Sequence, residues 1–230
     1  MFSIWQLSVV FFLNLVAIRV FAYCATRLGI LIDSPNDRSA HRHPTVRGAG
    51  VIFVISALLF WTFIGNRSNS GFLPGLILGG SVIAAISFID DVRSLSAGIR
   101  LAVHAIAALI FISSIPLPLF YGVDPRIIAL LWWPMATVFL VGVSNIYNFM
   151  DGIDGMSSLH SILVLLGWIT LFGVPHRADV LVSLGLLVPL IAFLTLNWFP
   201  AKVFMGDVGS IFIGYSIGCL ALLQAPNFSS

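Results

Sequence analysis

Charged residues are scarce in this chain, and one kind is missing. Only 9% of the 230 residues are charged, and all nine acidic residues are aspartates because the sequence contains no glutamate. The net charge of +2 and the lack of any dense Lys/Arg tract argue against nucleic-acid binding, which needs many phosphate contacts. The two cysteines, Cys24 and Cys219, are too far apart in sequence for a CxxC redox or zinc motif. These shortages argue against a nucleic-acid-binding protein and against a CxxC redox or zinc protein.

Apolar residues make up most of the chain. The sequence is 59% hydrophobic with a mean hydropathy of +1.06, which is more apolar surface than a water-soluble core of this length can hide. Runs near the roughly 20 residues that a membrane-spanning helix needs recur between short polar breaks. We therefore predict an all-α, polytopic transmembrane bundle forming one membrane domain over residues 1–230. We expect about eight spans, near residues 2–22, 49–65, 73–89, 101–117, 127–144, 156–174, 180–197 and 210–225.

Charged residues are sorted between the two membrane faces. Most of the basic residues lie in the breaks that follow the first, third, fifth and seventh spans, which we call the odd-numbered breaks. These residues are Arg27, Arg38, Arg42, Arg47, Arg93, Arg100 and Lys202. Lys and Arg accumulate in cytoplasmic loops, so we predict that these breaks are cytoplasmic. Seven aspartates are on the same side: Asp33, Asp37, Asp90, Asp91, Asp151, Asp154 and Asp207. Insertion rules do not explain this excess, and we interpret the face as functional. Asp179 lies on the predicted outer face, where we expect a silent position.

Asp90 and Asp91 form the first candidate site, at the end of the span near 73–89. Two adjacent carboxylates raise each other's pKa or require a cation, which makes the pair a candidate base or metal neighbour. The alternative is an ordinary loop entry with two solvated acids.

A second candidate site follows the span near 127–144. Amide and carboxylate side chains recur there at intervals of three, at Asn145, Asn148, Asp151 and Asp154. Residues three apart are neighbours on a helix, so the spacing predicts a row of oxygens along a helix end. Two Asp-Gly turns are the alternative, but asparagines at the end of an apolar span are costly and favour function.

Two further loops complete the predicted face. Asp207 stands between Gly206 and Gly209, as an oxygen ligand for a divalent cation, as an N-cap for the helix that follows, or as both. The first loop is basic, and its side chains either surround phosphates or serve only for topology and lipid-headgroup attraction. These basic residues are Arg38, His41, Arg42, His43 and Arg47.

The combination of these loops indicates phosphoryl transfer. Carboxylate-held Mg²⁺ and basic side chains together neutralise the charge of transferring phosphates. A transporter or channel is the main alternative, and it predicts charges near the membrane midplane rather than at span ends. An intramembrane aspartyl protease, a third class, predicts two buried aspartates on adjacent helices rather than seven along one face.

The order and spacing of the motifs resemble a known family. They comprise Pro35 to His41 with Pro44-Thr45 and Arg47-Gly48, then Asp90-Asp91, Asn145 to Gly155, and Phe204 to Ser210. Together they resemble glycosyltransferase family 4, the bacterial polyprenyl-phosphate N-acetylhexosamine-1-phosphate transferases. That family includes the initiators of O-antigen, common antigen and teichoic acid and the related phospho-N-acetylmuramoyl-pentapeptide translocase. The first loop is more similar to that of the O-antigen initiators than to that of the translocase.

The resemblance implies a reaction and its partners. Undecaprenyl phosphate in the bacterial inner membrane would attack the sugar-side phosphorus of a UDP-N-acetylhexosamine, releasing UMP with Mg²⁺ or Mn²⁺ as cofactor. Homodimers are compatible with the family. The resemblance also assigns roles by position: Asp207 to the metal, and Asp90 and Asp91 to the family's catalytic paired aspartates, which would activate the lipid phosphate and lie near the metal. It assigns Asn145, Asn148, Asp151 and Asp154 to the nucleotide-sugar loop. Phe204 matches a position that can stack on uracil, and Arg100 one that is often Lys or Arg.

Some features depart from the family pattern. Val46, Ala49 and His104 replace a usual Pro, Gly and Gln. Family members usually have ten or eleven spans and a later histidine-bearing loop that helps to bind the nucleotide-sugar. We therefore expect this chain to be C-terminally truncated relative to the family and to turn over little by itself.

Overall fold

The computed structural model describes residues 3–34, 43–66, 70–118, 120–172 and 177–224. These residues form eight α-helices and two very short strands. The elements are α1 (Ile4–Leu28), β1 (Ile32–Asp33), β2 (Thr45–Val46), α2 (Gly50–Gly65), α3 (Leu73–Val92), α4 (Ala97–Ile112), α5 (Pro125–Met150), α6 (Met156–Phe172), α7 (Arg177–Asn197) and α8 (Gly206–Gln224). The predicted all-α bundle is confirmed.

Five of these helices are long and apolar enough to cross a membrane: α1, α3, α5, α7 and α8. The other three, α2, α4 and α6, are equally apolar in character but have only 16 or 17 residues. Each helix coincides with one of the expected spans, so the chain is a multi-pass membrane protein. The largest differences in boundary are at the ends of α1 and α5: α1 continues to Leu28 rather than ending near residue 22, and α5 continues to Met150 rather than ending near residue 144.

Local capping explains several helix boundaries. The Ser96 hydroxyl accepts a hydrogen bond from the Ile99 amide and so begins α4 before its apolar run. The Asp124 carboxylate accepts from the Arg126 amide at 2.8 Å, and Pro125 occupies the first position of α5, where a missing N–H costs nothing. Gly29 ends α1 with a φ of 65°, a left-handed conformation that glycine adopts without strain.

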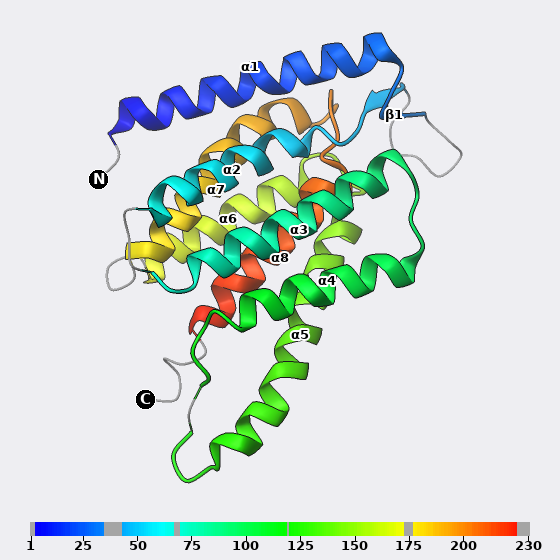
Figure 1. Ribbon diagram of the computed structural model, residues 1–230. Helices are drawn as coiled ribbons and strands as arrows, with labels where there is room; N and C mark the ends of the chain where they lie inside the picture. Colours follow the sequence, from blue (N-terminus) through cyan, green and yellow to red (C-terminus); the bar gives the residue numbers. More distant parts are fainter. Residues whose placement is uncertain (1–2, 35–42, 67–69, 119, 173–176, 225–230) are drawn as a thin grey trace.

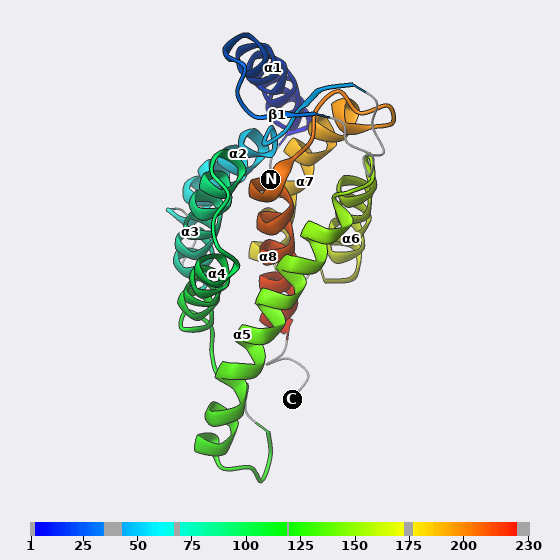
Figure 2. The same ribbon diagram turned by 90° about the vertical axis from the view of Figure 1, so that its right-hand side faces the viewer.

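The helices are arranged around α8, the last of them along the chain (Figures 1 and 2). Of an 18-residue apolar stretch of α8, 72% is buried inside the structure. The corresponding share for α1, which lies along the outside of the bundle, is 11%. Helices α3 and α5 make the most extensive contacts with α8. The N-terminal half of α5 extends away from the other helices (Figure 2). The exposed apolar faces of α1 and α5 are the surfaces expected to contact lipid.

Small residues allow α8 to approach its neighbours closely. A Cβ atom at Gly50 of α2 would lie 2.6 Å from the carbonyl oxygen of Met205 and 2.7 Å from the Cα of Gly209. A Cβ atom at Gly214 would lie 2.7 Å from the Cα of Ser144 on α5. Glycines at such contacts are typical of helix packing in membranes, where backbones gain contact by close approach.

The odd-numbered connections meet at one end of the bundle, at the right in Figure 1. β1 pairs antiparallel with β2, and Val46 of β2 pairs in parallel with Val203 from the segment between α7 and α8. The Phe204 amide donates to the Val46 carbonyl at 2.8 Å, and the Ala49 amide donates to the Phe204 carbonyl at 3.1 Å. The first connection is therefore attached directly to the segment that leads into α8. The side of the membrane that this end faces stays a prediction.

The expected loop position of Asp179 is wrong. This residue belongs to the first turn of α7 and is buried, with 5% of its surface exposed. Its carboxylate accepts a hydrogen bond from Gln224 Nε2 of α8 at 3.1 Å. Asp179 therefore joins two helices at the end of the bundle opposite the aspartate-rich connections, and it is unsuitable as a silent control position.

Candidate active site

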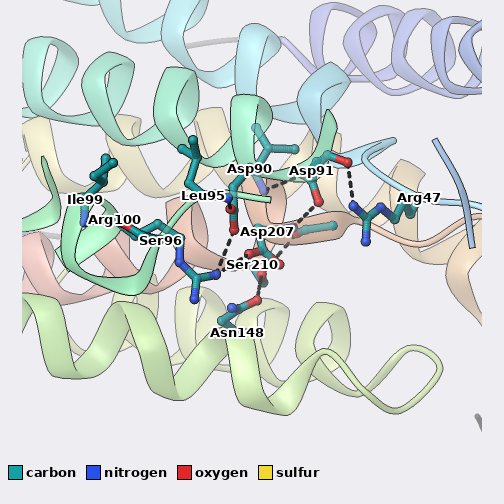
Figure 3. A network of polar contacts seen from close by, with 12 residues as sticks. Arg47, Asp90, Asp91, Leu95, Ser96, Ile99, Arg100, Asn148, Asp207 and Ser210 are labelled. Carbon is teal, nitrogen blue, oxygen red and sulfur yellow. Dashed lines mark hydrogen bonds and ion pairs between the residues drawn. The ribbon is translucent and has the colours of Figure 1, made fainter. Parts of the chain in front are cut away.

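The end of α3 holds the beginning of α8 through Asp91. Both carboxylate oxygens of Asp91 accept backbone hydrogen bonds, from the amides of Asp207 and Val208, each at 3.0 Å (Figure 3). Only 4% of Asp91 is exposed. The first amides of a helix have no intrahelical partner and carry the positive end of its dipole, so a buried carboxylate satisfies them well. Asp91 thus caps α8 from a different helix.

Two glycines make room for this contact. Gly206 has a φ of 72°, and a Cβ atom there would lie 2.7 and 2.8 Å from the two Asp91 carboxylate oxygens. The same Cβ would lie 2.8 Å from the Cα of Gly48 in the first connection. The guanidinium of Arg47 donates to the main-chain carbonyl of Asp91. The first connection, α3 and α8 are therefore fixed to one another at this point.

Asp90 points to different partners. Its Oδ1 accepts from the Leu95 amide at 2.6 Å, and its Oδ2 lies 2.7 Å from Nη1 of Arg100 on α4. The same Nη1 lies 3.5 Å from Oδ2 of Asp207 (Figure 3). Two carboxylates and a guanidinium thus form a cluster at the end of the bundle, where Asp207 has 27% of its side chain exposed. The sequence placed Asp90 and Asp91 together, but the structure gives them separate contacts.

The alternative interpretation of Asp207 as a helix N-cap is wrong. The helix begins at Gly206, so Asp207 lies inside the first turn, and the capping carboxylate belongs to Asp91. Its side chain instead contacts Arg100.

The predicted row on α5 is only partly present. Asn148 lies at the cluster, where its Oδ1 accepts from the Ser210 hydroxyl of α8 at 2.9 Å (Figure 3). Asn145 donates to the Val141 carbonyl within its own helix at 2.7 Å. Because α5 ends at Met150 and Asp151 is its C-cap, the row does not continue along a helix to Asp154.

The two aspartates beyond α5 differ in their surroundings. Burial raises the pKa of Asp151 well above its ordinary value, and the negative charges of Asp207, Asp91 and Asp154 act in the same direction. Asp151 therefore belongs electrostatically to the same cluster. Asp154 accepts from the Ala201 amide at 2.9 Å and so holds the segment between α7 and α8.

The structure adds Asn197 and Ser158, for which no role was predicted from the sequence. Asn197 is 3% exposed, accepts from the Ser158 hydroxyl of α6 at 3.0 Å and donates to the Val203 carbonyl at 3.0 Å. It therefore fixes the segment that carries Phe204 and Asp207. A polar residue at the end of an apolar span was the signal available in the sequence.

Phe204, Arg38 and His41 are the remaining predicted site residues, and His104 is a position that departs from the family pattern. Phe204 is half-buried, and its backbone is held by the pairing with β2. Arg38 and His41 lie outside the described residues. His104 is buried one turn after Arg100 on α4, and its Nε2 has no hydrogen-bond partner within the described part of the chain.

The carboxylates of the cluster could hold Mg²⁺. Within the described ranges, no three His, Cys or Asp side chains are arranged as a ready-made metal cage. Mg²⁺ does not require such a cage, because one or two carboxylates usually bind it together with water and substrate phosphates. Asp207 is the accessible carboxylate and Asp90 its neighbour through Arg100, so the oxygen ligands that Mg²⁺ prefers are available.

Comparison with known proteins shows the family of the chain. The sequence model of glycosyl transferase family 4 matches residues 73–225, which include α3 to α8 and most of the cluster. The chain belongs to glycosyl transferase family 4. The resemblance inferred from the motifs is therefore confirmed at the level of the family.

Individual relatives of the family give the same picture. The chain is 28% identical over 227 residues to the probable undecaprenyl-phosphate N-acetylglucosaminyl 1-phosphate transferase of Bacillus subtilis (strain 168), covering 95% of this chain and 63% of the relative. It is 31% identical over 197 residues to the phospho-N-acetylmuramoyl-pentapeptide-transferase of Clostridium botulinum (strain Alaska E43 / Type E3), covering 78% and 60%. The chain thus spans about three fifths of the length of these family members.

Proposed function

We propose that this chain carries the catalytic face of a membrane transferase that moves an N-acetylhexosamine 1-phosphate from a UDP-sugar to undecaprenyl phosphate. The main observation in its support is the Asp90–Arg100–Asp207 cluster at one end of a membrane bundle, in a family whose named relatives are transferases of this kind. The finer assignment is the initiating step of a cell-surface polysaccharide such as O-antigen.

The proposed reaction is a displacement at phosphorus. A phosphate oxygen of undecaprenyl phosphate forms a bond to the sugar-side phosphorus of the UDP-sugar, and the bond from that phosphorus to the bridging oxygen breaks. UMP leaves with the bridging oxygen, and the product is the undecaprenyl diphospho-sugar. Bound Mg²⁺ supplies charge neutralisation for the diphosphate and for the departing UMP.

The residues of the site have distinct parts in this proposal. Asp207, with Asp90 beside it, would hold the metal, and Arg100 supplies positive charge next to the same carboxylates. Asn148 accepts a hydrogen bond from Ser210, three residues after Asp207 on α8, and would contact the nucleotide-sugar. Phe204, two residues before α8 and half-buried, would stack on uracil.

The location of the site at the membrane surface supports this function over the two alternatives. The lipid phosphate lies at the headgroup level and the nucleotide-sugar comes from water, so a shared site must lie at a span end. The Asp90–Asp207 cluster is at such an end, whereas a transport pathway needs polar groups through the membrane. Asp91, whose two oxygens cap a helix, is not free to act as one of two proteolytic carboxylates.

Magnesium-dependent exchange of labelled UMP into UDP-N-acetylglucosamine, measured in membranes with undecaprenyl phosphate, tests the proposal. We expect exchange, slow in this chain by itself, that requires the lipid phosphate and Mg²⁺ and that falls about 100- to 1,000-fold in Asp207→Asn. The matched control is Asp124→Asn, because Asp124 is an exposed N-cap at the opposite end of α5 and Asn caps equally well. Unchanged exchange in Asp207→Asn would refute the assigned metal ligand. A panel of UDP-sugars with and without an N-acetyl group then identifies the donor.

A further inference from the structure

Arg100 occupies a place that is unfavourable for a basic residue by itself. It lies in the first turn of α4, four residues after the N-cap Ser96, where the positive end of the helix dipole repels a cation. Side chains of a helix lean towards its N-terminus, and Arg100 accordingly reaches back to the carboxylates of α3 and α8 (Figure 3). The position is therefore explained by those carboxylates and not by α4.

The two contacts of Arg100 are unequal. Asp90 is almost buried, its Oδ1 is fixed by the Leu95 amide, and its Oδ2 lies at 2.7 Å from Nη1. The contact of the same Nη1 with Asp207 is 3.5 Å long, and the Asp207 side chain is 27% exposed. The Arg100 side chain is itself 36% exposed. The link to Asp90 is thus the anchored one, and the link to Asp207 is the one that can be released.

We propose that Arg100 is a built-in counter-cation that competes with the divalent metal for Asp207. This inference rests on the proposed function, which brings a metal to Asp207. A divalent cation and a guanidinium repel each other, so both cannot be stabilised against the same carboxylate oxygen at full strength. Metal binding at Asp207 therefore turns the guanidinium away from that oxygen while Asp90 still holds it.

The competition also couples the metal to the diphosphate. Guanidinium donors that leave Asp207 become available to phosphate oxygens, for which their planar geometry is suited. A diphosphate that attracts Arg100 in turn removes a positive charge from Asp207 and strengthens metal binding. Since such coupling is reciprocal, metal and nucleotide should each raise the affinity of the site for the other.

Two simpler roles for Arg100 predict different changes in metal affinity when its charge is removed. If Arg100 only binds phosphate, its removal leaves metal affinity in the absence of nucleotide unchanged. If it only holds α4 against α3 and α8, its removal loosens the cluster and weakens metal binding. Competition alone predicts tighter metal binding after the charge is removed.

The experiment is a titration of the purified chain with Mn²⁺, followed by electron paramagnetic resonance of the free ion, with and without UDP. We expect the Kd for Mn²⁺ to fall about tenfold in Arg100→Gln, equivalent to about 1.4 kcal/mol, without nucleotide. UDP should lower the Kd strongly in the wild type and much less in the variant. Arg93→Gln is the matched control, because Arg93 is an exposed basic residue two positions after Asp91, and it should change the Kd less than twofold.

Each outcome is informative. A Kd in Arg100→Gln equal to or higher than that of the wild type would overturn the inference while leaving the proposed function intact. Failure of the wild type to bind Mn²⁺ even with UDP would contradict the metal site of the proposed function itself. Arg100→Met is the second neutral variant if the glutamine variant does not fold. In the wild type, saturating Mn²⁺ should also accelerate modification of Arg100 by phenylglyoxal, and an unchanged rate would count against release from Asp207.

Discussion

Replacement of Asp91 by Asn tests the connection between α3 and α8. In the wild type, the amides of Asp207 and Val208 each donate to a different carboxylate oxygen of Asp91. Asparagine keeps the size of the side chain but has only one acceptor oxygen. The new Nδ2 group would face an amide donor that it cannot satisfy. We expect the beginning of α8, and with it Asp207, to lose its fixed position.

The size of the effect follows from the contacts. An unsatisfied buried donor costs about 1–3 kcal/mol, and loss of a charge at a helix N-terminus costs about 0.3–2 kcal/mol. Asp91 is 4% exposed, so water cannot replace the lost acceptor. The free energy for opening the first turn of α8 should therefore fall by about 2–4 kcal/mol, which corresponds to about 30- to 1,000-fold faster exchange of its amides.

Hydrogen–deuterium exchange with mass spectrometry of the segment around residues 204–210 measures this directly in detergent. Asp124→Asn is again the control, because its single capping bond is local and exposed and is retained by Asn. We expect no change in exchange near α5 for that variant. If the amides around residue 207 exchanged as slowly in Asp91→Asn as in the wild type, the capping of α8 by Asp91 would have no energetic importance and the reasoning would be refuted.

Three further predictions concern the rest of the bundle. Asp179→Ala should lower stability by about 1–3 kcal/mol through loss of the buried contact with Gln224, and should leave exchange activity per folded molecule unchanged. Thermal unfolding in detergent and the exchange assay check these two results. A variant as stable as the wild type would show that the contact is dispensable. Gly50→Ala should destabilise by about 1–3 kcal/mol because its Cβ has no room against α8, and unaltered thermal stability would contradict the close packing. In a background without native cysteines, cysteine at exposed Ser94 should react with an impermeant reagent only from the cytoplasmic side and cysteine at Tyr121 only from outside; the reverse pattern would invert the topology.

The helices were predictable because hydropathy is a local property. Every expected span corresponds to a helix, since an apolar run must satisfy its backbone internally in lipid. The errors occur where polar residues continue a helix beyond its apolar part, as Asn145 and Asn148 do at the end of α5. Asp179 was placed in a loop for the same reason, because hydropathy alone does not show that α7 begins at Arg177.

The contacts within the site were much less predictable. Asp90, Asp91 and Asp207 could be selected from their residue types and from their position at span ends. Their separate contacts could not, because Asp91 and Asp207 are 116 residues apart in the chain and no local period records their meeting. The same holds for Asn197, whose partner Ser158 is 39 residues away on another helix.

The pairing of the first connection with the segment before α8 has a consequence for biogenesis. Gly48 and Val46 leave the ribosome early, whereas their partners around Val203 and Gly206 are synthesised roughly 10–30 s later at ordinary elongation rates. During that interval Asp91 has no helix end to cap, and the amide-bearing segment between α7 and α8 is still missing. This end of the bundle is incomplete until then. The contacts of the site can form only after the beginning of α8 has been synthesised.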